Sequence, residues 1–199
     1  MTAHAVVWLG SGMSTPASAA CPIVHVPPHA FDAPRGRYRI RAAQPSDEAG
    51  LRRMLEEAAP DDVRLRFFMY VRRFPHEFIA PMARSDDCRN FAFVAFRDTA
   101  NAPVVGSAMM AADADGRAAE FGIFVARAEA GQRLGTHLLD CLIREARGHG
   151  IAAIHGLILA ENRNMRDLAR RLGFIISTSD EPGCVRAELH VEPAAAAAQ

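Results

Sequence analysis

The sequence predicts one α/β (α+β) domain with the element order β-α-α-β-β-β-α-β-α-β-β. Two observations lead to this fold class. The chain has 199 residues, 50% of them hydrophobic and 23% charged, which suits one compact core but is short for two. The hydrophobic pattern also switches between a period of two and a period near 3.6, so strands and helices follow one another along the chain.

Both ends of the chain differ in composition from the middle. Residues 1–35 mix glycine, serine, proline and alanine without a sustained period, which predicts a flexible N-terminal extension. Residues 194–199 form a low-complexity tail. We therefore expect the folded domain to span residues 36–193.

The first part of this domain is expected to hold one strand and two helical segments. Residues 37–41 alternate polar and apolar side chains, as a half-buried strand does, and Pro45-Ser46-Asp47 supplies a turn and a helix cap. Residues 47–59 then form an amphipathic helix with an apolar face of Leu51, Met54, Leu55 and Ala58. Prolines interrupt the helical character of residues 61–84, so a broken helix is predicted there.

Three strands are predicted next, because the period changes. Residues 91–96 and 104–110 are apolar runs joined by a short polar loop, which indicates a β-hairpin. A third strand over residues 118–126 follows the turn at 114–117.

Helices and strands alternate in the C-terminal part. A glycine-containing loop leads into a helix that Gly148-His149-Gly150 ends, with an apolar face of Leu138, Leu139, Leu142, Ile143 and Ala146. The order is completed by a strand over 152–159, a helix over 165–172 closed by Gly173, and strands near 174–178 and 185–191.

Composition argues against several classes of protein. The 23 basic residues balance the 23 acidic ones, so no cationic surface for nucleic acid is indicated. No apolar run approaches the roughly 18 residues that a membrane span needs. Four widely spaced cysteines and eight histidines show no metal-ligand spacing, so we predict no metal site. These features favour a cytoplasmic protein with reduced thiols and without membrane or nucleic-acid partners.

The loop Glu129–Thr136 is the most informative segment, because it joins a predicted strand to a predicted helix. Unpaired backbone N–H groups and the positive end of the helix dipole suit a pyrophosphate at such a position. Gly131 and Gly135 would let phosphate oxygens approach the backbone closely. An ordinary strand-to-helix turn has the same features, so both interpretations remain open on the residues alone.

Together with the element order, this loop resembles part of the motif of the GNAT superfamily, which comprises acyl-CoA-dependent N-acyltransferases. The superfamily pattern is Gln or Arg, two residues, Gly, one residue, then Gly or Ala, and Ala130 and Arg133 depart from it. A second segment, Ala160–Met165 followed by Leu168–Phe174, is similar to the "Asn…Leu…Gly-Phe" helix of the same superfamily.

One subgroup of this superfamily matches further segments. Residues 61–68, 119–121 and 161–165 resemble the bacterial protein-lysine acetyltransferase domains that are often fused to an acyl-CoA-synthetase-like region. The resemblance implies a mixed, mostly antiparallel sheet of about seven strands flanked by about four helices. It covers roughly residues 37–192 and does not include the synthetase-like region.

The resemblance also implies acetyl-CoA as co-substrate. Its pyrophosphate would lie on the loop, and its pantetheine arm would lie against a strand end much as an added strand would. The residues expected to bind it are Ile123, Phe124, Val125, Gly131, Gln132, Arg133, Leu134, Gly135, Thr136, Asn162 and Met165. Arg133 either obstructs the loop or pairs with a phosphate, and Gln132 is either a solvated residue or a phosphate donor.

Glu120 matches the catalytic glutamate of the subgroup and is the expected general base. An acceptor ammonium with a pKa near 10.4 must lose a proton before it attacks a thioester, and a carboxylate can accept that proton. The alternative is an edge-facing or salt-bridged glutamate. Phe67-Phe68-Met69-Tyr70 either lines an acceptor cleft or belongs to the core.

The expected function is acetyl transfer from acetyl-CoA to an amine, with protein lysine as the favoured acceptor and a homodimer as a possible assembly. Ala169 stands where many relatives carry a tyrosine that protonates the leaving thiolate, and Leu157 stands where the subgroup carries a glutamate. These departures keep two alternatives open. One is a small-molecule amine N-acetyltransferase, and the other is a non-catalytic acyl-CoA-binding module.

Overall fold

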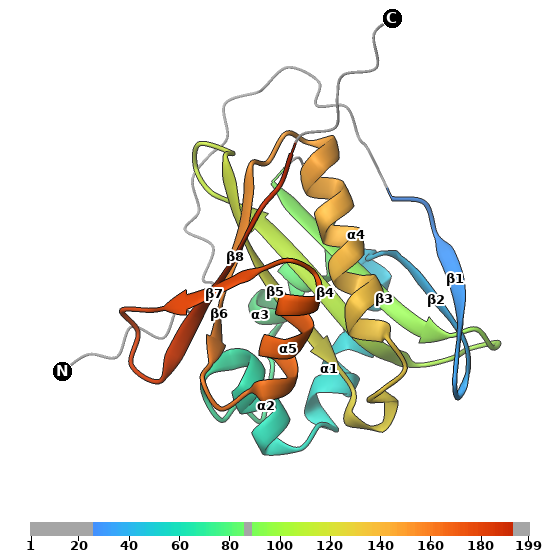
Figure 1. Cartoon of the computed structure of the whole chain (residues 1–199). Helices are drawn as coiled ribbons and strands as arrows, with labels where there is room; N and C mark the ends of the chain where they lie inside the picture. The colour runs from blue at the N-terminus through green and yellow to red at the C-terminus, as the bar shows by residue number, and fades with distance from the viewer. Residues whose placement is uncertain (1–25, 86–88, 193–199) are drawn as a thin grey trace, which may run out of the picture.

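The computed structural model of the protein describes residues 26–85 and 89–192. Eight strands form one sheet in the order β1-β2-β3-β4-β5-β6-β8-β7 (Figure 1). All neighbouring strands are antiparallel except β5 and β6, so the predicted mixed, mostly antiparallel sheet is confirmed. The strands are β1 (His29–Ala33), β2 (Gly36–Ala42), β3 (Asn90–Arg97), β4 (Val104–Ala112), β5 (Ala118–Val125), β6 (Ala153–Leu159), β7 (Ile175–Thr178) and β8 (Cys184–His190).

Helices pack on both faces of the sheet (Figure 1). The helices are α1 (Glu48–Glu56), α2 (Pro60–Phe67), α3 (His76–Ile79), α4 (Leu134–Gly148) and α5 (Arg163–Arg171). Helices α4 and α5 share one hydrophobic core with the sheet, and α1, α2 and α3 share a second core on the opposite face. Strand β3 is apolar from Phe91 to Phe96, and these side chains alternate between the two cores.

The sequence analysis assigned His29–Ala33 to the flexible extension, and the structure corrects this assignment. These residues form strand β1, which pairs with β2 at the edge of the sheet. Phe31 stacks on Tyr38 of β2 and on His137 of α4, with ring centroids 5.8 Å and 3.6 Å apart. The surrounding prolines hid this short edge strand, because only its tertiary contacts stabilise it. Residues 1–25 and 194–199 of the predicted ends lie outside the described residues.

The broken helix predicted over residues 61–84 is present as α2 and α3. Phe68 adopts a left-handed conformation (φ 61°) that ends α2, and Pro75 precedes α3. Helix α1 follows a 3₁₀ turn at Pro45–Asp47. The Asp47 carboxylate accepts hydrogen bonds from the Gln44 backbone N–H (2.9 Å) and from the Arg41 guanidinium (2.6 Å), which fixes the entry into α1.

The sheet opens between β5 and β6. The two strands pair in parallel only where Ala118–Glu120 face Ala153–His155. Beyond Glu120, β5 stays paired with β4 on one side as far as Val125, but no strand of the described residues pairs with its other side. One edge of residues 121–125 therefore keeps its backbone groups available for a ligand.

Candidate active site

Glu120 lies on β5 where the sheet begins to open. Its half-buried side chain lines a cavity on the face covered by α2 and α3. The cavity walls are mainly apolar or aromatic, and they comprise Phe67, Phe68, Met69, Phe78, Pro81, Met82, Met109, Ala111, Phe121 and Gly122. Phe67–Met69, which the sequence placed either in a cleft or in the core, therefore lines this cavity.

Arg66 of α2 is the second charged residue in this cavity, and the sequence analysis did not identify it. Its guanidinium lies 4.9 Å from the centre of the Phe67 ring and packs against Gly122 of β5, where a Cβ atom would overlap it. Burial lowers the pKa of Arg66 to about 10, and the nearby Glu120 carboxylate partly opposes this shift. The absence of a side chain at Gly122 is what admits the guanidinium.

Arg66 and Glu120 share the cavity without pairing. In the described part of the chain they form no ion pair with each other, and neither side chain has a hydrogen-bond partner. The buried Nε atom of Arg66 is unsatisfied. His155 of β6 is the register partner of Glu120 and projects from the same face, half-buried, with its Nε2 3.7 Å from Asp113. The cavity therefore holds a carboxylate and a guanidinium that have no partner among the described residues.

The predicted pantetheine residues form the part of β5 beyond Glu120. Ile123 and Val125 project into the core shared with α4 and α5, whereas Phe124 projects into the opposite core. The three side chains therefore do not make one surface. What they share is the unpaired backbone edge that faces the opening toward β6.

The start of α4 offers backbone donors near this opening. The first hydrogen bond of the helix runs from His137 N–H to Arg133 C=O, so the N–H groups of Leu134, Gly135 and Thr136 precede it. Leu134 itself is a core side chain. A Cβ atom at Gly135 would lie 2.8 Å from Cδ2 of Leu168, so glycine allows α5 to pack against the start of α4.

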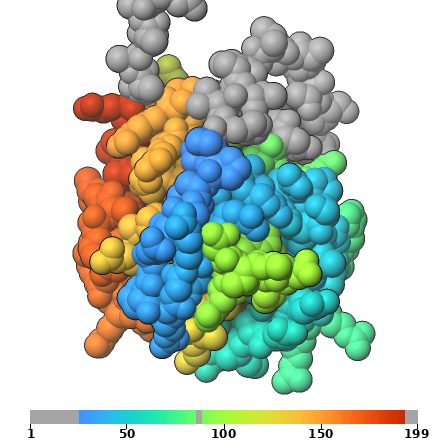
Figure 2. All heavy atoms as spheres, turned by 90° about the vertical axis from the view of Figure 1, so that its right-hand side faces the viewer, coloured from blue at the N-terminus to red at the C-terminus, as the bar shows by residue number. Residues whose placement is uncertain are grey.

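The Gln132 side chain is directed toward the β1–β2 hairpin, and a role of this residue in cofactor binding stays a prediction. It is only 4% exposed, and its Oε1 accepts a hydrogen bond from Arg35 N–H at 2.7 Å. Arg35 also donates to Ala128 C=O at 2.7 Å. These two bonds tie the turn of the β1–β2 hairpin, which lies on the face turned toward the viewer in Figure 2, to the loop before α4. Gly131, beside Gln132, is exposed in a left-handed conformation (φ 79°).

A buried carboxylate anchors the beginning of the same loop. Glu129 accepts hydrogen bonds from the Tyr38 hydroxyl at 2.6 Å and from Arg97 at 2.7 and 2.9 Å. Burial, followed by the hydrogen bond to Glu129, raises the pKa of Tyr38 above its ordinary value. The segment Glu129–Gln132 is therefore held from both of its ends.

Asn162 and Met165 belong to the start of α5. Asn162 is the N-cap residue, and its Oδ1 accepts a hydrogen bond from Met165 N–H at 3.1 Å. Met165 is half-buried against the core on the α4 side of the sheet. Asn162 therefore has a structural role as the cap of α5, and its role in cofactor binding stays a prediction.

Two ion pairs hold α2 next to the opening of the sheet. Arg64 pairs with Glu161, which precedes α5, and Arg127 pairs with Asp62 at 2.6 and 2.9 Å. These contacts link α2 to the segments that follow β5 and β6. They fix the helix that carries Arg66.

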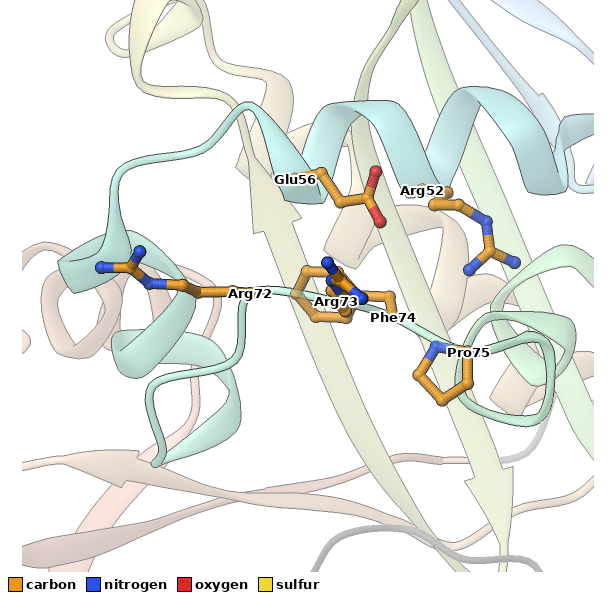
Figure 3. Close-up of a pocket in the computed structure, with 6 residues that line it drawn as sticks. All are labelled: Arg52, Glu56, Arg72, Arg73, Phe74 and Pro75. Atoms are coloured by element: carbon orange, nitrogen blue, oxygen red, sulfur yellow. The ribbon is translucent and has the colours of Figure 1, made fainter.

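A separate groove lies between α1 and the α2–α3 connection (Figure 3). It is lined by Arg52, Glu56, Arg72, Arg73, Phe74 and Pro75. None of the residues that the sequence analysis assigned to the site lines it. The ring of Phe74 packs on Phe67 and Phe78, with centroids 5.7 and 5.4 Å apart, and separates this groove from the cavity of Glu120.

Residues 26–85 and 89–192 contain no cluster of three or more histidine, cysteine, aspartate or glutamate side chains arranged to hold a metal ion. No helix within these ranges has the length and apolar character required to cross a membrane.

Arg133 stands at a backbone position that favours glycine. Its φ is 62° and its ψ is 5°, and a side chain in this left-handed region costs about 1 kcal/mol. We expect Arg133→Gly to raise the free energy of unfolding by about 0.5–1 kcal/mol in urea denaturation. Arg133→Ala is the matched control, because it removes the guanidinium but keeps the strain. Equal effects of both variants would contradict this explanation.

Comparison with known proteins agrees with this geometry. The family model described as the acetyltransferase (GNAT) family matches residues 50–174. The chain is similar to the GNAT domain of S. lividans PAT, with a TM-score of 0.74 and 21% identity over 82% of this chain and 97% of that one. It is also similar to yncA from Salmonella typhimurium, solved with its cofactor acetyl-CoA, with a TM-score of 0.60 and 20% identity over 80% and 96% of the two chains.

A third similar structure is the cAMP-binding acyltransferase from Mycobacterium smegmatis, with a TM-score of 0.57 and 21% identity over 84% of this chain. The present chain covers 48% of that protein. The family match extends over more than half of the sequence, and the protein belongs to the acetyltransferase (GNAT) family. The resemblance inferred from the motifs is thereby confirmed, and so is the prediction of an N-acetyltransferase at the level of the family.

Proposed function

We propose that the protein transfers the acetyl group of acetyl-CoA to an amine, with Glu120 as the general base. One observation carries the proposal. The Glu120 carboxylate faces a cavity beside the unpaired edge of β5, and it has no hydrogen-bond partner among the described residues. A carboxylate without a partner is free to accept a proton from a bound acceptor.

The chemistry follows from the acceptor's charge. An alkylammonium has a pKa near 10.4 and lacks the lone pair needed for attack, so the proton passes to Glu120. The amine nitrogen then bonds to the thioester carbonyl carbon while the carbon–sulfur bond breaks. Ala169 lies where many relatives carry a tyrosine, so water or the acceptor returns a proton to the coenzyme A thiolate.

The residues around the opening suit an acyl-CoA. The unpaired edge of residues 121–125 would pair with the amide groups of the pantetheine arm. The N–H groups of Leu134, Gly135 and Thr136 would hold the pyrophosphate at the start of α4. Arg133 is exposed at this point, and its guanidinium would pair with a phosphate oxygen in place of the contacts that a glycine loop provides.

Protein lysine is the first acceptor that we propose. The apolar walls of the cavity suit the four methylenes of a lysine side chain, and Glu120 would meet its amine. A small-molecule amine is the second candidate, and a specific observation favours it. The free Arg66 guanidinium in the same cavity would repel a lysine ammonium, but it would attract an acceptor that also carries a negative charge.

Calorimetric titration with acetyl-CoA, followed by detection of free thiol with a panel of amines and lysine peptides, tests the proposal. We expect binding to the isolated chain and thiol release that depends on the acceptor. Binding without thiol release for any acceptor would instead identify a non-catalytic acyl-CoA-binding module. An absence of binding would contradict the assignment of the cofactor site.

A further inference from the structure

The unpartnered guanidinium of Arg66 requires an explanation. A buried polar group without a hydrogen bond is destabilising, and such groups in native proteins are uncommon. Arg66 is held in this state, since α2 is fixed by the Arg64–Glu161 and Arg127–Asp62 ion pairs. The guanidinium also occupies space that only a glycine at position 122 leaves open.

The second observation is that the cavity contains opposite charges that do not neutralise each other. Arg66 and Glu120 are close enough for the carboxylate to raise the pKa of the guanidinium, yet they form no ion pair. Both groups face the same cavity. A ligand with one positive and one negative group can therefore bind between them and satisfy both.

The third observation concerns the walls. Phenylalanine and methionine side chains dominate the rest of the lining, with Phe67, Phe78, Met82 and Met109 among them. Such walls stabilise an apolar group and offer no further charged partner. The lining thus complements a ligand whose charges lie together at one end and whose remainder is apolar.

We infer that the acceptor is a small apolar α-amino acid, whose carboxylate binds Arg66 while its amino group meets Glu120. The inference rests on the proposed function and selects its second candidate, the small-molecule amine, over protein lysine. The guanidinium donates to the carboxylate, which supplies the missing partner of Arg66. Glu120 takes one proton from the ammonium group, the nitrogen bonds to the acetyl carbon, and the carbon–sulfur bond breaks. The products are an N-acetylamino acid and coenzyme A.

Pairs of acceptors that differ only in the carboxylate provide the test. L-Methionine is compared with 3-(methylthio)propylamine, and L-phenylalanine with 2-phenylethylamine. We expect kcat/KM to be higher for each amino acid than for its amine by roughly 30-fold or more, because a buried charge pair loses that much when one partner is removed. A lysine peptide without a free carboxylate near its amine serves as the third acceptor.

Variants then assign this preference to Arg66. We expect Arg66→Met to reduce the amino acid to amine ratio to within a few-fold of one, and Arg66→Lys to keep part of it because the charge remains. Gly122→Ala should lower the ratio as well, since its Cβ displaces the guanidinium. Arg72→Met is the matched control, because Arg72 is an exposed arginine that lines the separate groove and not the cavity.

The outcomes separate this inference from the proposed function. Acetylation of the amines or the lysine peptide at least as efficiently as the amino acids would overturn the inference and leave the acetyltransferase intact. An unchanged ratio in Arg66→Met would also overturn it. If the protein binds acetyl-CoA but releases no thiol with any of the acceptors, the proposed function itself is contradicted.

Calorimetry with L-methionine in the presence of coenzyme A gives a readout independent of turnover, and Arg66→Met should weaken that binding by at least roughly 10-fold.

Discussion

Replacing Glu120 with glutamine is expected to lower kcat by roughly 10²- to 10⁴-fold while acetyl-CoA binding is retained. Glutamine keeps the size and polarity of the side chain but cannot accept the acceptor's proton. Calorimetry with acetyl-CoA and steady-state thiol release measure the two quantities separately. Loss of both together would indicate a structural role for Glu120 and not a catalytic one.

The pH dependence of this variant provides a second readout. Without a base, the reaction depends on acceptor that is already neutral, and this fraction rises about tenfold per pH unit below the ammonium pKa near 10.4. The rate of Glu120→Gln should therefore approach the wild-type rate as the pH increases. Glu56→Gln is a suitable control, because Glu56 is exposed on α1 outside the cavity. A wild-type rate in Glu120→Gln at neutral pH would eliminate the assignment.

Alkaline pH is expected to destabilise the fold, and Cys141 should account for most of the effect. This thiol lies in the core at 1% exposure, and burial raises its pKa from 9.0 to about 12. The unfolded chain releases the proton near pH 9, whereas the folded chain retains it until about pH 12. Folded protein therefore binds more protons in this window, and stability falls by up to about 4 kcal/mol as the pH rises through it.

Urea denaturation at several pH values between 8 and 12 checks this expectation. Cys141→Ala should show a smaller decrease of the unfolding free energy with pH than the wild type. Cys184→Ala is the control, because it also removes a thiol, but one that is only half-buried. Tyr38, whose pKa is also raised, adds a further loss above pH 10 in every variant. Identical slopes for wild type and Cys141→Ala would refute the role of this thiol.

Arg133, which departs from the family motif, and its neighbour Gln132 acquire a physical meaning in the structure. The Oε1 atom of Gln132 accepts a hydrogen bond from the Arg35 backbone N–H, so this side chain is directed toward the hairpin that β1 forms with β2. Arg133 accepts a strained conformation where other members carry glycine. Sequence spacing aligned both residues with a phosphate loop, but it does not reveal which way a side chain points. The direction of the Gln132 side chain depends on the hairpin that β1 forms with β2. The composition of the N-terminal residues gave no indication of β1.

The sequence by itself determined the element order from β2 onward, the mixed character of the sheet through its family resemblance, and the positions of Glu120 and the start of α4. These features follow from local periodicity, turn residues and short motifs, all of which are readable along the chain. Only the tertiary structure decided that Arg66 of α2 and Glu120 of β5 line the same cavity without pairing. This arrangement brings together residues distant in sequence, and it depends on the gap at Gly122 and on ion pairs that hold α2 in place.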